Sequence, residues 1–330
     1  MTMRKLVITL KTLGTLALAL CGLFTGPLAM AQGWPAKPVK IYTAFAAGSA
    51  SDIIARMLAQ ELQTEYGQPF VVDNKPGASG VIAADLLTKS APDGYTLMLT
   101  TNTVNSANPH LFKKLSYDPV KDFTPIARVA SATFILAVAA DSPIKQASDM
   151  ATYAKANPGK INFAYGNSTG QIAGAAFNNL AGLNGTAIPY KSTPQALAAL
   201  VGGEVTFLFV DLASSNTLLK AGRLRALAVT TETKSSLAPD IPALASAANL
   251  PGFDLAAWVG IVGPAAMPAD ITSKLSTSIN RILARKDIVD RLNALGTDVT
   301  PGTSAELSVY MGQQLNAWRD KIKAAGMQPE

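Results

Sequence analysis

The sequence has one cysteine, one histidine and no dense cluster of charge. The cysteine, Cys21, falls in the first 31 residues, so no disulfide, cysteine nucleophile or thiolate metal site is available beyond them. A zinc site would need three or four ligands, and His110 would be its only nitrogen ligand. We therefore expect neither a metal nor a cofactor.

Charge is sparse and scattered, because only 15% of the residues are charged. Residues 1–31 hold Arg4, Lys5 and Lys11 and no acid, so of 28 basic residues 25 remain beyond residue 31, against 22 acidic ones. The remainder carries a net charge of +3 without any run of Lys or Arg, which argues against binding of nucleic acid or of a membrane surface. The sequence also has no fixed-period repeat and no low-complexity tract.

Residues 1–31 have the three parts of a secretory signal peptide. Basic residues come first, an apolar run reaches Leu28, and Ala29-Met30-Ala31 forms a small-residue cleavage site. A membrane anchor is the alternative, but the run has about 17 residues and several glycines, which is marginal for a span. A lipoprotein attached at Cys21 is less favoured, because Leu20 stands where such signals usually have a small residue. We expect cleavage after Ala31 and an exported chain long enough for two domains.

One stretch, residues 39–63, shows the pattern that the rest of the chain repeats. A β-branched strand (39–43) leads through a small-residue turn (46–51) into an amphipathic helix. Such a turn directs free backbone N–H groups and the positive end of the helix dipole to one point, which suits an anion. The alternative is an ordinary helix start, with Ser49 and Asp52 forming a capping box.

Strands and helices alternate along the whole chain, which predicts an α/β fold with mixed, mainly parallel sheets and flanking helices. Several strand ends lead into small polar loops, and in open α/β sheets ligands bind at such ends. The length favours two lobes with a cleft between them. We place the first lobe at residues 32–133 and 257–330 and the second at 134–256, with the apolar stretches 134–139 and 258–262 as crossings between lobes.

Residues 166–170, GNSTG, match the nucleophile elbow of serine hydrolases, with Ser168 as nucleophile. A general base to activate Ser168 is hard to identify, because His110 lies upstream, whereas in these enzymes the histidine follows the serine. Lys191 would be another candidate base. A secreted serine hydrolase therefore remains an alternative, against the simpler interpretation of a small polar turn.

Seven stretches, in this order, resemble the Bug family, the periplasmic receptors of tripartite tricarboxylate transporters. The likeness runs from about residue 35 to the C-terminal helix, and the stretches are TAFAAGSASDIIAR, NKPGASG, ANPHLFKKLSYDPVKDFTPIARV, KANPGKINFAYGNSTGQIAG, IPYKSTPQALAALVGGEVTFLFVD, AGRLRALAVTTETKSSLAPDIPAL and PGFDLAAWVGIVGPAAMP.

The resemblance implies a two-lobed, type II periplasmic-binding-protein fold and a small carboxylated solute held by backbone amides, hydroxyls and water. The family's first turn matches Phe45, Ala47, Gly48 and Ser49, with Asp52. Its second-lobe loop matches residues 167–171 and its strand-end aspartate matches Asp211. The chain departs from the family at Ala44, where proline is common, at Ser49, where glycine is usual, and in residues 172–177, which lack a histidine.

We therefore interpret the chain as a periplasmic binding protein, not an enzyme, that closes about a hinge on a small organic carboxylate. The first turn would bind one carboxylate through the amides of Gly48 and Ser49. Further contacts would come from the facing loops, through Asn102, Asn105, Ser168, Thr169 and Gln171, through Tyr190 and Lys191 at the second end of the ligand, and through Asp211 for a cationic group. We expect a monomer that delivers its solute to an inner-membrane permease or, alternatively, presents it to a sensor protein.

Overall fold

The computed structural model describes residues 33–329. The expected signal peptide, its cleavage after Ala31 and the lipoprotein alternative at Cys21 lie outside these residues. Contacts divide the chain into residues Met1–Ala36 and Lys37–Glu330, and every helix and strand below belongs to the second unit. Within the described residues, no helix combines the length and the apolar character needed to cross a membrane.

The first sheet combines strands from both ends of the sequence. Its parallel part has β1 at the centre and consists of β2 (Phe70–Asn74), β1 (Val39–Thr43) and β3 (Thr96–Thr101). Its antiparallel part continues from β3 and consists of β9 (Ala256–Pro264), β4 (Phe123–Ala139) and β10 (Thr297–Gly302). The sheet is therefore mixed, and residues from near the end of the chain complete it.

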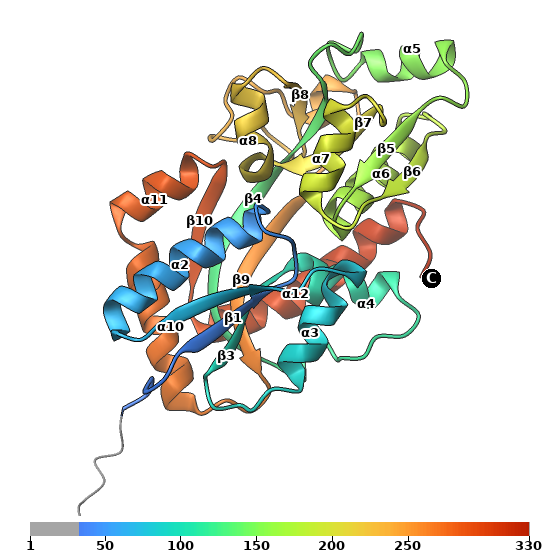
Figure 1. Cartoon of the computed structure of the whole chain (residues 1–330). Helices are drawn as coiled ribbons and strands as arrows, with labels where there is room; N and C mark the ends of the chain where they lie inside the picture. Colours follow the sequence, from blue (N-terminus) through green and yellow to red (C-terminus); the bar gives the residue numbers. More distant parts are fainter. Residues whose placement is uncertain (1–32, 330) are drawn as a thin grey trace, which may run out of the picture. The chain divides into compact units, whose positions relative to one another are not determined.

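Strand β4 is 17 residues long and continues from the first sheet into the second (Figure 1). Up to Thr133 it pairs with β9 and β10, and from Phe134 onward it pairs with strands of the second sheet. Those strands are β7 (Phe207–Asp211) and β8 (Leu224–Val229), both antiparallel to β4, followed by β5 (Asn162–Tyr165) and β6 (Thr186–Pro189), which run parallel to β7. In the described part of the chain, one strand thus links two mixed sheets.

Helices and short turns connect and cover the strands (Figure 1). Those between or after strands of the first sheet are α2 (Ala50–Tyr66), the 3-10 turn η2 (Ala78–Gly80), α3 (Val81–Thr88), the π-helical turn η3 (Thr103–Ala107), α4 (Asn108–Leu111), α10 (Ala269–Leu283) and α11 (Lys286–Asn293). Those of the second sheet are α5 (Asp149–Ala156), α6 (Ser168–Leu180), α7 (Thr193–Val201), α8 (Leu212–Lys220) and α9 (Leu244–Ala247). The predicted α/β class with flanking helices is confirmed.

The apolar stretch 134–139 is buried on both faces of the second sheet. Phe134, Leu136 and Val138 belong to the core cluster on one face, whereas Ile135 and Ala137 belong to the cluster on the other. Successive side chains of a strand point to opposite faces, so a strand covered on both sides needs a continuous apolar run.

The last helix, α12 (Ser304–Ala324), contributes to the cores of both sheets. It begins with a capping box, in which Thr303 and Glu306 satisfy each other's backbone amides. Its first turns place Leu307 and Met311 in the core of the first sheet, and its last turns place Trp318 and Ile322 in a core of the second. The helix therefore packs across the junction that β4 also crosses.

Candidate functional site

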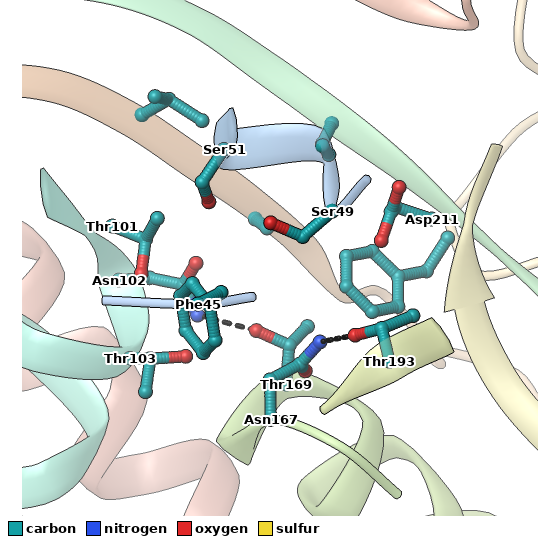
Figure 2. Close-up of a pocket in the computed structure, with 15 residues that line it drawn as sticks. Phe45, Ser49, Ser51, Thr101, Asn102, Thr103, Asn167, Thr169, Thr193 and Asp211 are labelled. Atoms are coloured by element: carbon teal, nitrogen blue, oxygen red, sulfur yellow. Dashed lines mark hydrogen bonds between the residues drawn. The ribbon is translucent and has the colours of Figure 1, made fainter. Parts of the chain in front are cut away.

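A polar pocket lies where the carboxyl ends of β1, β3 and β7 meet, and we call it the first pocket (Figure 2). It encloses about 390 Å³ of empty space, part of it open to solvent. The lining residues come from elements of both sheets, and they are Phe45, Ser49, Ala50, Ser51, Thr101, Asn102, Thr103, Ala132, Phe134, Asn167, Thr169, Thr193, Asp211, Ala257 and Val259. Hydroxyl and amide groups supply most of its polar atoms, so the pocket can form many hydrogen bonds without a strong net charge.

The first turn is held by side chains rather than left open. Ser49 is the N-cap of α2, and its hydroxyl accepts the Asp52 amide at 3.4 Å. The Asp52 carboxylate accepts the Gly48 amide at 3.0 Å, and Gly48 has a φ of +81°, which glycine tolerates best. The Ser49 amide donates to the carbonyl of Ala46 at 3.2 Å. The amides of Gly48 and Ser49, which the sequence suggested as ligand donors, thus have partners within the turn.

Asp52 organises this turn through a buried network. Its Oδ1 accepts hydrogen bonds from Arg56 and from Asn74, both at 2.9 Å, and Asn74 also donates to the carbonyl of Phe45 at 3.0 Å. Burial alone would raise the pKa of Asp52, but hydrogen bonds from Arg56, Asn74 and Gly48 outweigh it and lower the pKa. The carboxylate stays ionised and fixes the position of Phe45 at the pocket.

One hydrogen bond joins the two sheets across the first pocket. The side chain of Asn102, after β3, donates to the hydroxyl of Thr169, in the first turn of α6, at 2.7 Å (Figure 2). A second such bond lies nearby, from the amide of Ala50, at the start of α2, to the hydroxyl of Ser214 at 3.1 Å. The pocket is therefore bordered by direct contacts between elements of the first and second sheets.

On the side of the second sheet, Asn167 links two loops. Its Oδ1 caps α6 by accepting the Gly170 amide at 2.9 Å, and its Nδ2 donates to the Thr193 hydroxyl at 3.1 Å (Figure 2). The loops approach closely at Gly166, where an added Cβ would lie 2.3 Å from the backbone nitrogen of Thr193. Glycine is needed there because the backbone leaves no space for a side chain.

Asp211 ends β7 and is 4% exposed. Its Oδ1 accepts the Ser214 amide at 2.7 Å and so caps α8. Burial raises the pKa of Asp211, and hydrogen bonds from Ser214 oppose that rise only in part. Of the described residues that line the first pocket, Asp211 alone is charged.

A second pocket adjoins the first, since Phe45 and Asn167 line both. It encloses about 740 Å³ of empty space, again partly open to solvent. Its wall includes the glycine-rich turn 77–80, the side chain of Gln171 and the loop that contains Tyr190 and Lys191. The hydroxyl of Tyr190 donates to Glu204 at 3.4 Å, whereas Lys191 is exposed.

The structure brings together only some of the expected site residues. Phe45, Ser49, Asn102, Thr169 and Asp211 line the first pocket. Gln171, Tyr190 and Lys191 line the second.

The remaining expected residues do not line either pocket. Ala47 and Gly48 are exposed in the first turn, and Asp52 lies behind it. Asn105 is buried, and it accepts from Thr100 at 2.5 Å and donates to the carbonyl of Pro119 at 2.9 Å. The side chains of Asp52 and Asn105 thus support the loops of the site.

Ser168 is not placed for nucleophilic attack. It is fully buried, and its hydroxyl donates to Oδ1 of Asn108 at 3.2 Å. His110 is no partner for it, because its Nε2 hydrogen-bonds the carbonyl of Leu315 at 2.8 Å. Since a serine needs an adjacent base to act as a nucleophile, this geometry argues against the hydrolase alternative. In the described part of the chain, no group of three or more His, Cys, Asp or Glu side chains is arranged to hold a metal.

Five polar residues of the first pocket are absent from the set expected from the sequence: Ser51, Thr101, Thr103, Asn167 and Thr193. Each lies at or just after the end of a strand, or at the start of a helix, so the rule that ligands bind at strand ends could have included them. Thr101 is the most informative, because its buried hydroxyl has no hydrogen-bond partner among the described residues.

Comparison with known proteins identifies the class. Residues 54–327 match the model of the tripartite tricarboxylate transporter family receptor. The chain therefore belongs to this family, as its resemblance to the Bug proteins predicted.

Solved structures agree with this membership. The Rhodopseudomonas palustris protein Rpa4515 with adipate is 30% identical, with a TM-score of 0.87 over 90% of this chain and 100% of that one. The periplasmic binding protein BugD is 28% identical, with a TM-score of 0.85 over 90% of this chain and 100% of that one. MatC from R. palustris with bound malate is 30% identical, with a TM-score of 0.82 over 88% of this chain and 100% of that one.

Proposed function

We propose that this protein is a periplasmic, non-enzymatic receptor that captures a small organic carboxylate between its two sheets. The observation that carries the proposal is a pair of adjoining pockets, in which neutral hydroxyl and amide groups from both sheets converge beside the hydrogen bond between Asn102 and Thr169. Hydrogen-bond donors that need no reorganisation suit a carboxylate whose charge is spread over two oxygens.

The family and its ligands support the choice of a carboxylate. Two of the similar structures contain the dicarboxylates adipate and malate, which differ in length and in hydroxylation. The contacts here would come from Ser49, Ser51, Thr101, Asn167 and Thr169 in the first pocket and from Gln171, Tyr190 and Lys191 in the second. Asp52, Asn105 and Ser168 would position the loops.

The two sheets would act as lobes that close about a hinge. The first lobe would comprise residues 32–133 and 257–330, and the second residues 134–256. The change of pairing partners in β4 between Thr133 and Phe134 supports the first boundary. The hydrogen bonds from Asn102 to Thr169 and from Ala50 to Ser214 would form on closure and break on opening.

Location and partners follow from the family. The family supports a periplasmic location and a transporter partner, and we further propose that the chain is exported, cleaved after Ala31 and retained as a monomer that delivers its solute to inner-membrane permease subunits. The family model describes transporter receptors, whereas the comparisons give no support to a sensor partner or to a hydrolase.

Thermal-shift screening tests the proposal with matched pairs of solutes, each carboxylate beside its neutral amide. We expect at least one carboxylate to raise the melting temperature while its amide does not, because binding to the folded state alone stabilises it. A panel in which no carboxylate shifts the melting temperature, while a sugar or a metal ion does, would overturn the proposed ligand class.

A further inference from the structure

The two adjoining pockets are lined by residues of opposite charge. Of the described residues that line them, Asp211 is the one charged residue of the first pocket and Lys191 is the one charged residue of the second. Phe45 and Asn167 lie between the two, because both line both pockets.

Strand order explains how far apart the charges lie. β7, β5 and β6 are neighbours in the second sheet, with Ala164 paired to Leu208 and Tyr165 paired to Pro189. Continued past the strand ends, this register places Asp211, Asn167 and Lys191 side by side. Adjacent strands are about 4.8 Å apart, so the backbones at Asp211 and Lys191 are separated by roughly 10 Å.

Asp211 also lacks a charge partner. Asp211 is only 4% exposed, and none of the ion pairs among the described residues involves it. A buried carboxylate without a cation is costly, and a second carboxylate beside it would add repulsion. A cationic nitrogen on the solute would instead form a charge-assisted hydrogen bond with Asp211.

We infer that the two pockets form one composite site for an elongated zwitterion, with a cationic nitrogen at Asp211 and a carboxylate directed toward Lys191. This inference rests on the proposed function and narrows its ligand class to straight-chain amino acids whose two charges lie at opposite ends. The hydroxyl of Thr101, which has no partner among the described residues, lines the first pocket and is available to another polar group of the solute. Lys191 is exposed, so its contribution is the smaller of the two.

Calorimetric titration of the protein with adipate and ε-aminocaproate tests the inference, because these two solutes differ mainly at one end. We expect ε-aminocaproate to bind at least tenfold more tightly than adipate. The shorter straight-chain amino acids γ-aminobutyrate and β-alanine should bind progressively more weakly than ε-aminocaproate. Asp211→Asn keeps a good N-cap for α8 and removes the charge. It should reduce ε-aminocaproate binding at least tenfold without reducing adipate binding.

The contact between Lys191 and the carboxylate end of the solute is tested by Lys191→Met, which keeps the length of the side chain. We expect a loss of about two- to fivefold for ε-aminocaproate and none for hexylamine, which lacks the carboxylate. Lys155→Met on α5, outside both pockets, is the matched control.

The outcomes separate the two proposals. If wild-type protein binds adipate as tightly as or more tightly than ε-aminocaproate, the zwitterion inference is wrong and carboxylate capture stands. If neither these solutes nor any other carboxylate binds, both proposals fail. The comparison of ligands on wild-type protein decides the matter even if Asp211→Asn does not fold.

Discussion

The side-chain amide of Asn102 donates a 2.7 Å hydrogen bond to the hydroxyl of Thr169, although the two residues are 67 positions apart in the sequence. Asn102 follows a strand of the first sheet, and Thr169 lies in a helix that covers the second. Both residues are buried and line the same pocket. Side chains that line the pocket therefore also form the contact between the sheets.

Thr169→Val keeps the shape of the side chain and removes this hydrogen bond. We expect the solute to bind more weakly by about 0.5–1.5 kcal/mol, roughly two- to tenfold in Kd, mainly through faster dissociation. Thr206→Val is the matched control, because the hydroxyl of Thr206 bonds Asn162 at 3.0 Å, away from both pockets. Stopped-flow dissociation rates that change equally in the two variants would show that the Asn102 bond has no special part in retention.

Gly166→Ala should damage both stability and binding. The added Cβ would lie 2.3 Å from the backbone of Ser192 and Thr193, so the loop that carries Thr193 must move. We expect a loss of about 1–3 kcal/mol in the free energy of unfolding, together with weaker solute binding. Gly312 in α12 has no atom within 4 Å of an added Cβ, so Gly312→Ala should stabilise the protein by about 0.5–1 kcal/mol. Denaturant unfolding of both variants provides the check, and a neutral Gly166→Ala would contradict the close approach.

The hydrogen-bond network around Asp52 makes the stability of the fold depend on pH. Because its pKa is lowered in the folded protein, Asp52 stabilises the fold above its usual pKa of 3.8, and this contribution disappears as the pH falls through the folded-state pKa. Asp52→Asn should cost about 1–2 kcal/mol near neutral pH, and the difference from wild type should shrink below pH 3.8.

Unfolding curves recorded across that pH range measure the difference directly. Asp290→Asn removes an exposed carboxylate paired with Lys286 and serves as the control, for which we expect a small effect at neutral pH. A difference between wild type and Asp52→Asn that grows toward acid pH would mean that the sign of the Asp52 contribution is wrong.

Ser168→Ala separates the binding interpretation from the catalytic one. The substitution leaves Oδ1 of buried Asn108 without the Ser168 hydroxyl, so we expect a loss of about 1–3 kcal/mol in stability. Ser168 lines neither pocket, but its bond to Asn108 joins the two proposed lobes, so solute affinity should fall about as much as in Thr169→Val. Assays with activated esters should find no activity in wild type, and an esterase activity that disappears in Ser168→Ala would overturn the non-enzymatic assignment.

The local pattern of apolar and β-branched residues was sufficient to predict most of the secondary structure. The strand expected at 39–43 is β1, because β-branched residues at alternate positions favour a strand. The apolar run 134–139 is a strand covered on both faces, as its composition indicated. The αβ alternation also gave the class of fold, since it requires helices over the faces of a sheet.

Long-range pairing explains what local pattern missed. The segment TDVTPG contains Asp, Pro and Gly, which are depleted in strands, yet it forms β10 by pairing with β4, more than a hundred residues earlier. The polar run after β3, expected as a loop, contains the π-helical turn η3. Tertiary contacts outweighed propensity at both places.

The site was predictable as a set of loops rather than as a set of side chains. The two pockets lie at strand-end loops, where the sequence analysis expected a site, but backbone position does not determine which polar atoms find partners within the protein. Asn105 and Ser168 are satisfied by Thr100 and Asn108, and the Gly48 amide is satisfied by Asp52. Thr193 reaches the pocket because Gly166 lets two loops approach, a contact that neither loop reveals alone.

A crystal structure of the protein with the carboxylate that binds most tightly tests the central claim most directly. The account predicts a solute in the first or second pocket, in contact with Asn167, with its carboxylate oxygens bonded to hydroxyl or amide groups or to Lys191. A tightly bound carboxylate found outside both pockets, such as in the surface groove beside Arg128 and Tyr310, would contradict it.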